Sequence, residues 1–545
     1  MERRTLLKGM AAGLSSLCLS SSYAGKLLKA PYVSGPFKPT WDSLTQYKVP
    51  DWFRDAKFGM WAHWGPQCQP EYGDWYAREM YMEGSSQYKY HVQKYGHPSK
   101  FGFKDVIHEW KAENWNPEEL VGLYKKAGAK YFMALANHHD NFDLYNSRYQ
   151  KWNSTRMGPK KDLVSGWAKA AKHHELKFGV SVHAAHAWSW LETAQRADKN
   201  GPMAGIPYDG KVTKAEGAGK WWNGENPQEL YAQNHLLSEK SQDNGMIHRQ
   251  WNWGNGVTPP SKEYCENFYK RTIDLIDKYG PEVIYYDDTA LPLWPASDVG
   301  LHIAARLYNT NIKKHGKLEA VIFGKILDEQ QRKCMVWDIE RGQSNQIEAQ
   351  PWQTDTCIGG WHYDRRIYDR NQYKSAKTVI HTLIDVVSKN GNLMLNIPVR
   401  GDGTVDDKER AVVEEIAAWM KINSESIYST RPWKTFGEGP AMESVAPLSA
   451  QGFNEGKGKP FTGEDIRFVT KGKTLYATLL GWPAGQTALI KTLRSNVSGK
   501  VERVKLLGNS DNLVFDQTAT GLKVTLPEKE TGKSAFVLKI EGSIT

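Results

Sequence analysis

Short apolar runs recur along the first three quarters of the chain, and most end in polar or charged residues. The clearest are KFGMWAHWG (57–65), KYFMALANHHD (130–140), KFGVSVHAAHAW (177–188), PEVIYYDDT (281–289), LEAVIFGK (318–325), CMVWDIERG (334–342) and GNLMLNIPV (391–399). A run that stays apolar through its middle predicts a strand buried on both faces of a parallel sheet.

Amphipathic helical patterns lie between many of these runs. Examples are NPEELVGLYKKAGA (116–129), LVSGWAKAAKHHEL (163–176), YCENFYKRTIDLIDKYG (264–280) and SAKTVIHTLIDVVSKNG (375–391). The alternation predicts an α/β fold, a (β/α)8 barrel over residues 30–432, with a long Gly-, Trp- and Tyr-rich insertion within 153–255. Because barrel active sites lie at the C-terminal strand ends, the polar ends of the runs are the candidate site.

The pattern changes after Trp433. Short alternating runs such as LYATLLGWP, VERVKLLG and AFVLKIEG are separated by Gly, Asn or Pro. This predicts a C-terminal antiparallel β-sandwich over residues 433–545. It contains no catalytic constellation of its own, so we expect it to pack against the barrel.

The N-terminus predicts export. Arg3 and Arg4 precede a weakly apolar stretch that ends at Ala24, which is the pattern of a twin-arginine signal peptide over residues 1–24. The mature protein is then periplasmic or secreted. No later apolar run approaches the roughly 20 residues of a membrane span, so we expect no membrane partner. The cysteines beyond the signal are far apart and form no CxxC pair.

The net charge and the aromatic content limit the classes of partner that the sequence predicts. The net charge is +10, of which the signal contributes about +2, and the chain has 22 Trp and 26 Tyr. The basic balance predicts either a generally solvated surface or attraction to an anionic polysaccharide. The aromatic residues suit either an ordinary core or sugar-stacking surfaces. We expect no nucleic-acid partner, because the chain has no recognisable nucleic-acid-binding motif. The sequence does not indicate an oligomeric state.

Two polar clusters end predicted strands. His138 and His139 follow one run, and Asp287 and Asp288 follow another. The histidines can be hydrogen-bond donors for a polar ligand, a base with its orienting group, core residues, or metal ligands joined by the VHAAH histidines. Adjacent strand residues point to opposite faces, so only one of the two aspartates is expected to enter the barrel mouth.

Four stretches resemble the retaining α-L-fucosidases of glycoside hydrolase family 29. They are KFGMWAHWGPQCQPEYGDWY, HHDNFDLYNSRYQKWN, EVIYYDDT, and GNLMLNIPVRGDGTV together with WMKINSESIYSTRPW. They occur in the family's order and span essentially the whole predicted barrel. The resemblance implies an exo-acting hydrolase that removes terminal α-L-fucosyl residues from oligo- or polysaccharides by double displacement, without a cofactor or metal.

The resemblance also implies the catalytic pair. Asp287 follows an aromatic pair, as the family's nucleophile does, although relatives often have Gly where Asp288 stands. A retaining hydrolase needs a second carboxyl group roughly 5–5.5 Å from the first. Glu340 is the expected acid/base, with Glu348 as the next candidate. Gln353 stands where many relatives have Glu, and an amide cannot transfer a proton. Arg341 beside Glu340 can be a substrate clamp, an ion-pair partner or a surface charge.

The sugar-binding wall is predicted from the same motifs and strand ends. Its members are His63, Trp64, Trp75, Tyr76, His138, His139, His183, Trp188 and Tyr285. Relatives commonly have Tyr-Tyr-Ser where this chain has Ser181 to His183. That difference and Asp288 leave open an α-L-galactosidase acting on a sulfated algal galactan. A barrel that only binds glycan and a metal-dependent hydrolase are further alternatives.

Replacing both Arg3 and Arg4 with Lys is expected to block export, because the twin-arginine pair is the predicted recognition element of the signal peptide. Cell fractionation should then find folded, active protein in the cytoplasm. Unchanged export of the double variant would contradict a twin-arginine route.

Overall fold

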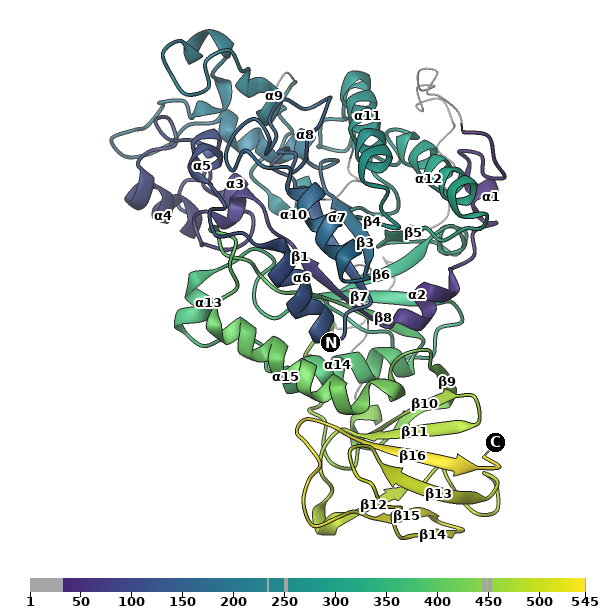
Figure 1. Ribbon diagram of the computed structural model, residues 1–545. Helices are drawn as coiled ribbons and strands as arrows, with labels where there is room; N and C mark the ends of the chain where they lie inside the picture. The colour runs from purple at the N-terminus through teal and green to yellow at the C-terminus, as the bar shows by residue number, and fades with distance from the viewer. Residues whose placement is uncertain (1–32, 233–234, 249–252, 444–447, 449–452, 545) are drawn as a thin grey trace, which may run out of the picture.

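The computed structural model describes residues 33–544 except 233–234, 249–252, 444–447 and 449–452, so the predicted signal at 1–24 lies outside the described residues. A barrel with surrounding helices occupies the upper part of Figure 1, and an antiparallel β domain lies below it. The predicted fold class is confirmed: a closed eight-stranded barrel is followed by a C-terminal domain of two antiparallel sheets.

All neighbouring strands of the barrel pair in parallel, including the closing pair of first and last strands. The strands are β1 Phe58–Ala62, β2 Tyr131–Asn137, β3 Lys177–Val182, β4 Val283–Tyr286, β5 Val321–Gly324, β6 Val336–Glu340, β7 Trp352–Cys357 and β8 Gly391–Asn396. Every predicted run supplies a strand. The sequence pattern missed β7 because its residues, WQTDTC, are mostly polar although all are buried.

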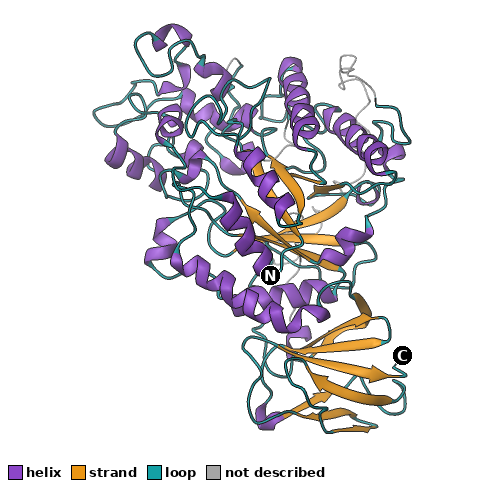
Figure 2. Cartoon of the chain, in the orientation of Figure 1, coloured by secondary structure: helices purple, strands orange, loops and turns teal. Residues whose placement is uncertain are grey.

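Six long helices surround the barrel (Figure 2): α6 Pro117–Lys126, α7 Leu163–His173, α11 Lys262–Tyr279, α12 Val299–His315, α14 Ala376–Ser388 and α15 Asp407–Asn423. The connections after β5 and β6 differ from the regular pattern. The first contains only a 3-10 turn at Gln331–Lys333, and the second, residues 341–351, contains no helix. The outer face of β6 must therefore be covered by another part of the chain.

Shorter helices belong to the connections. α1 Trp41–Leu44 and α2 Asp51–Ala56 precede β1, α3 Tyr76–Glu79, α4 Ser86–Tyr95 and α5 Phe103–Glu109 follow it, and α13 Arg365–Asp369 follows β7. The long insertion comes after β3 and contains α8 Ala187–Trp190, α9 Pro227–Tyr231 and α10 Asn244–Ile247. In Figure 1 it lies above the barrel, on the side away from the C-terminal domain.

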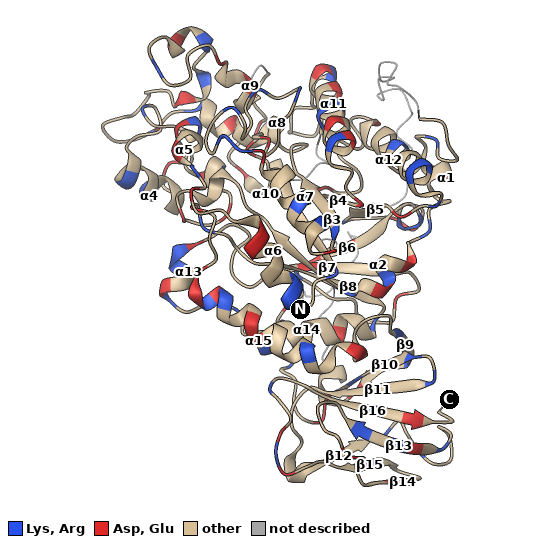
Figure 3. Ribbon diagram, in the orientation of Figure 1, with Lys and Arg blue, Asp and Glu red and all other residues tan. Residues whose placement is uncertain are grey.

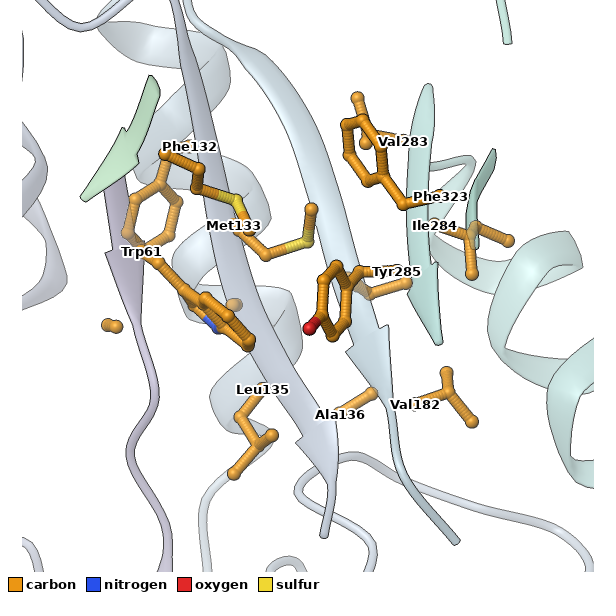
Figure 4. Close-up of a cluster of buried hydrophobic side chains, with 14 of the residues drawn as sticks. Trp61, Phe132, Met133, Leu135, Ala136, Val182, Val283, Ile284, Tyr285 and Phe323 are labelled. Atoms are coloured by element: carbon orange, nitrogen blue, oxygen red, sulfur yellow. The ribbon is translucent and has the colours of Figure 1, made fainter. Parts of the chain in front are cut away.

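Large side chains fill the barrel interior (Figure 4). The rings of Trp61 and Tyr285 lie 4.9 Å apart, and that of Phe323 lies 6.3 Å from Tyr285. Gly59 is required where Tyr131 crosses the interior, because a Cβ at 59 would lie 2.2 Å from that ring. The barrel is thus a packed core whose open end alone can admit a ligand.

The C-terminal domain consists of a five-stranded and a three-stranded antiparallel sheet. Its strands are β9 Arg431–Glu438, β10 Ile466–Lys471, β11 Thr474–Leu479, β12 Thr487–Ile490, β13 Val501–Leu506, β14 Phe515–Thr518, β15 Gly521–Thr525 and β16 Phe536–Gly542. Apolar residues from both sheets, such as Phe468, Leu522 and Leu538, share one buried cluster.

A buried ion cluster joins this domain to the barrel. Arg467 on β10 donates to Asp385 on α14 at 2.5 Å, and Lys389 donates to the other oxygen at 2.6 Å. All three side chains are at most 6% exposed. Burial alone would raise the pKa of Asp385, but the two cations outweigh burial and hold this pKa below its usual value.

Basic and acidic residues are interspersed on the outer helices that Figure 3 shows, for example on α11 and α15. Among the described residues, no helix is both long and apolar enough to cross a membrane. Cys68, Cys265, Cys334 and Cys357 are free and buried.

Asp385→Ala is expected to lower the free energy of unfolding by about 3–5 kcal/mol, because two buried cations lose their counter-ion. Arg467→Met should cost less, since Asp385 keeps Lys389. Denaturant titration measures both effects, and Arg503→Met, which breaks the exposed pair with Glu541, is the control. A loss for Asp385→Ala no larger than that of the control would contradict this account.

Candidate active site

A cavity of about 440 Å³ opens at the C-terminal ends of the barrel strands. Its volume is suited to a small polar ligand. Strands β1 to β7, or residues that follow them, supply most of its wall, and the insertion and the interdomain linker supply the rest. The side chains that line the cavity include Trp61, His63, Asp74, Trp75, His138, His183, His186, His248, Tyr285, Asp287, Lys325, Glu340, Arg341, Asp355, Trp361, His362 and Phe453.

Strand periodicity places acidic and basic groups together at the cavity floor. Tyr285 pairs with Phe323 in register, so Asp287 and Lys325, each two residues further on, share a level and a face. Glu340 pairs with Asp355 in the same way on β6 and β7. This inward-facing polar row explains why β7 lacks an apolar pattern.

The carboxylate of Asp287 contacts one ammonium group and the imidazole rings of neighbouring histidines. Its Oδ1 accepts a hydrogen bond from Lys325 Nζ at 2.5 Å, and its Oδ2 lies 3.2 Å from His139 Nε2 and 3.5 Å from His183 Nδ1. Burial alone would raise the pKa of Asp287, but Lys325 and the histidine contacts hold it well below the usual value. The carboxylate is therefore ionised at the cavity floor, as a nucleophile must be.

Asp288 is also among the residues that line the cavity, but its carboxyl group has a different partner. Its side chain is fully buried, and Oδ1 lies 3.1 Å from His186 Nε2. Burial raises the pKa of Asp288 above its usual value, whereas at Asp287 the contacts with Lys325 and the histidines outweigh burial and lower the pKa. The two neighbouring carboxyl groups thus have different surroundings, as expected for adjacent residues at a strand end.

Lys325 links the two predicted catalytic groups. Its ammonium also donates to Glu340 Oε2, so one nitrogen contacts both carboxylates. Two oxygens that share one hydrogen-bond donor can be at most about 6 Å apart, which is less than the roughly 6.5–9.5 Å that separates the carboxyl groups of inverting glycosidases. Burial opposes the charge of Lys325, but Asp287 and Glu340 outweigh burial and raise its pKa well above the usual value.

The other acid/base candidate lies away from the cavity. Glu348 precedes β7, near the N-terminal end of the barrel, and its backbone N–H donates to the Lys389 carbonyl at 3.2 Å. Gln353 is buried inside the barrel, where its side chain bonds Tyr131 and Asp338. The structure therefore brings only Glu340 of these residues beside Asp287.

Five residues of the predicted sugar-binding wall line the cavity: His63, Trp75, His138, His183 and Tyr285. His139 lies behind Asp287; its Nδ1 faces the His183 carbonyl at 2.9 Å. Burial and neighbouring histidines lower the pKa values of His63 and His138 well below the usual value, so these rings are neutral. Neutral imidazoles can both donate to and accept from hydroxyl groups.

Several polar ring atoms on this wall have no hydrogen-bond partner within the described protein. They are Trp61 Nε1, His63 Nδ1, His183 Nε2 and His362 Nε2. Buried polar groups are almost always paired, so these atoms are suited to a ligand with several hydroxyls. His63, His138 and His362 also offer nitrogens within 4.8 Å of one another, a spacing that a metal ion could use.

Four predicted wall residues do not line the cavity: His139, described above, and three aromatic residues. Trp64 packs against Trp110 and donates from Nε1 to the Arg400 carbonyl at 2.8 Å. Tyr76 is buried, and its hydroxyl bonds His91. Trp188 stacks on His235 within the insertion. Trp64 and Tyr76 directly follow His63 and Trp75, which do line the cavity, so the sequence motifs lie close to the site although these two side chains pack elsewhere.

Other cavity residues were not predicted from the sequence. Lys325 directly follows β5 in the run LEAVIFGK, and a charged residue at the end of an apolar run was a usable signal. His248 comes from the insertion, and its Nε2 lies 3.6 Å from Asp287 Oδ2. Phe453 comes from the linker between the domains, so no local pattern could place it in the cavity.

Comparisons with known proteins identify the family of this chain. The family model described as Alpha-L-fucosidase matches residues 28–425, and that described as Alpha-L-fucosidase C-terminal domain matches residues 459–541. Tissue alpha-L-fucosidase of Rattus norvegicus is 25% identical over 546 residues, covering 97% of this chain and 96% of the relative. Plasma alpha-L-fucosidase of Homo sapiens is 24% identical over 498 residues, covering 90% and 89%.

Solved structures of Thermotoga maritima alpha-fucosidase are also similar. The complex with a mechanism-based inhibitor is 26% identical, with a TM-score of 0.68, and covers 93% of this chain and all of that one. The complex with fucose is 25% identical, with a TM-score of 0.65, and covers 92% of this chain and all of that one. Since the family model spans most of the sequence and the predicted resemblance is confirmed, this chain belongs to the alpha-L-fucosidase family.

Proposed function

We propose that the protein is an exo-acting retaining α-L-fucosidase in which Asp287 is the nucleophile and Glu340 the acid/base. The observation that carries this proposal is the shared contact of both carboxylates with Lys325 at the cavity floor. Two carboxyl groups at this spacing allow a covalent glycosyl-enzyme intermediate, whereas inverting enzymes hold theirs further apart.

In the first step, Asp287 attacks the anomeric carbon while Glu340 protonates the leaving oxygen. The ammonium of Lys325 keeps Asp287 ionised despite burial. Once Asp287 has become an ester, its negative charge is gone, and Glu340 is left as the direct anionic partner of Lys325. This change in charge suits the second step, in which Glu340 removes a proton from water.

The neutral histidine wall supports recognition of a sugar. His63, His138 and His183 present ring nitrogens toward one small cavity, and Trp61 adds an indole N–H. L-Fucose is the proposed sugar because the similar proteins are named as fucosidases and one was solved with fucose. Export and an anionic polymer as the natural substrate stay predictions from the sequence.

The catalytic pair can be tested with an aryl α-L-fucoside and azide. Asp287→Ala should lose nearly all hydrolysis, and azide attacking from the freed face should yield a β-glycosyl azide. Glu340→Ala should still form the intermediate, because a good leaving group needs little protonation, and azide should then yield the α-glycosyl azide. Product stereochemistry by NMR separates the two roles.

Asp288→Asn and Glu348→Ala are the matched controls, and neither should show azide rescue. Rescue in Asp288→Asn would move the nucleophile by one residue, and rescue in Glu348→Ala would replace Glu340 as acid/base. Faster turnover of an aryl α-L-galactoside than of the fucoside by the unaltered enzyme would contradict the proposed sugar.

Lys325→Met should move the acidic limb of the kcat/KM profile to higher pH. The charge of Lys325 offsets the burial that would otherwise raise the pKa of Asp287, so its removal leaves less ionised nucleophile at low pH. The expected displacement is about 1–3 pH units. Lys325→Arg retains the charge and should keep the limb near its original position. An unmoved limb in the Met variant would show that Lys325 does not control Asp287.

A further inference from the structure

The linker between the two domains reaches the active-site cavity. Phe453 N–H donates to the Glu340 carbonyl at 2.8 Å, and Glu455 N–H donates to the Arg341 carbonyl at 3.0 Å. The side chain of Asn454 accepts from Gln343 N–H at 2.8 Å. These bonds attach residues 453–455 to the end of β6, directly beside the proposed acid/base.

The missing helix after β6 explains why the linker lies there. Leu448 from the linker packs against the buried cluster of Ile339, Trp352 and Val386, which a barrel helix would otherwise cover. A Cβ at Gly342 would lie 2.8 Å from the Asn454 side chain, so glycine permits the close approach.

Charged contacts fix the far end of this segment. The carboxylate of Glu455 accepts from Lys374 Nζ at 2.6 Å and from Thr356 Oγ1 at 2.9 Å. It also lies 3.5 Å from Arg341 Nε. The segment is therefore anchored at both its backbone and its side chains, and the charge of Arg341 already has a carboxylate partner.

Phe453 itself forms part of the cavity wall. It is 40% exposed although it is a large apolar residue, and it is anchored to the backbone of Glu340. The leaving group of the substrate must lie beside Glu340, because that residue protonates the leaving oxygen. The exposed ring is thus on the side of the cavity where the leaving group departs.

We propose that Phe453 is the stacking platform of a leaving-group subsite and that it takes a neutral sugar ring. This inference rests on the proposed function and specifies its substrate further. An aromatic face suits the apolar face of a sugar ring, and Arg341, which also lines this cavity, already has Glu455 as a carboxylate partner. Phe453 lies between the ranges matched by the two family models, so this subsite would be set by a segment that neither model covers.

Substrates with and without a ring in the leaving group test this role. The probes are α-L-fucosyl fluoride, which cannot reach Phe453, and the α-L-fucosyl disaccharide that the unaltered enzyme hydrolyses fastest in a panel of linkages. In Phe453→Ala, the ratio of kcat/KM for the disaccharide to that for the fluoride should fall roughly three- to tenfold, the effect of losing one aromatic contact. Phe453→Trp should restore the ratio, and Phe453→Leu should restore it only in part.

Val514→Ala, at an exposed apolar residue of the C-terminal domain, is the matched control and should keep the original ratio. The kcat/KM for the fluoride also reports whether Asp287 is still in position. An unchanged ratio in Phe453→Ala, or equal losses on both substrates, would overturn the platform while the proposed function stands. No turnover of the fluoride by the unaltered enzyme would overturn the proposed function and the platform with it.

Discussion

One buried ammonium determines how this active site is built. Lys325 contacts Asp287 and Glu340 at the same time, and all three side chains are at most 15% exposed. A buried charge is costly unless it is paired, so the three groups stabilise one another only when the ends of β4, β5 and β6 stand in register. The closed barrel supplies that register, because its pairing puts alternate residues of neighbouring strands at one level.

The groups around this ionic cluster differ in charge, and each charge state follows from burial and from the available partners. The histidine wall is neutral because burial lowers its pKa values, so it provides hydrogen bonds without adding charge. Below the site, burial raises the pKa of Asp338 to about 7, and Gln353 donates to this side chain. Asp287, which has Lys325 as its cation partner, stays ionised, whereas Asp338 and Asp355 deeper in the barrel have raised pKa values because they are buried.

The sequence predicted the parts of the fold and of the site that depend on the local pattern of apolar and polar residues. Apolar runs located seven strands, and strand-end positions located Asp287, Glu340 and His138. It could not locate β7, whose alternate residues form the polar interior. It also could not predict the direction of the Trp64 and Trp188 side chains, which pack against rings from other parts of the chain. Phe453 is more than a hundred residues from the strand it contacts, and only the missing helix after β6 explains its place.

The central claim is that Asp287 forms a covalent bond to the sugar, and trapping that bond tests it most directly. Incubation with 2-deoxy-2-fluoro-α-L-fucosyl fluoride should form the ester but slow its hydrolysis, since the fluorine destabilises the positively charged transition state. Peptide mass spectrometry of the protein is then expected to place one 2-fluorofucosyl group on Asp287. A label on Asp288 or another residue, or turnover with no labelled peptide at any time, would contradict the account.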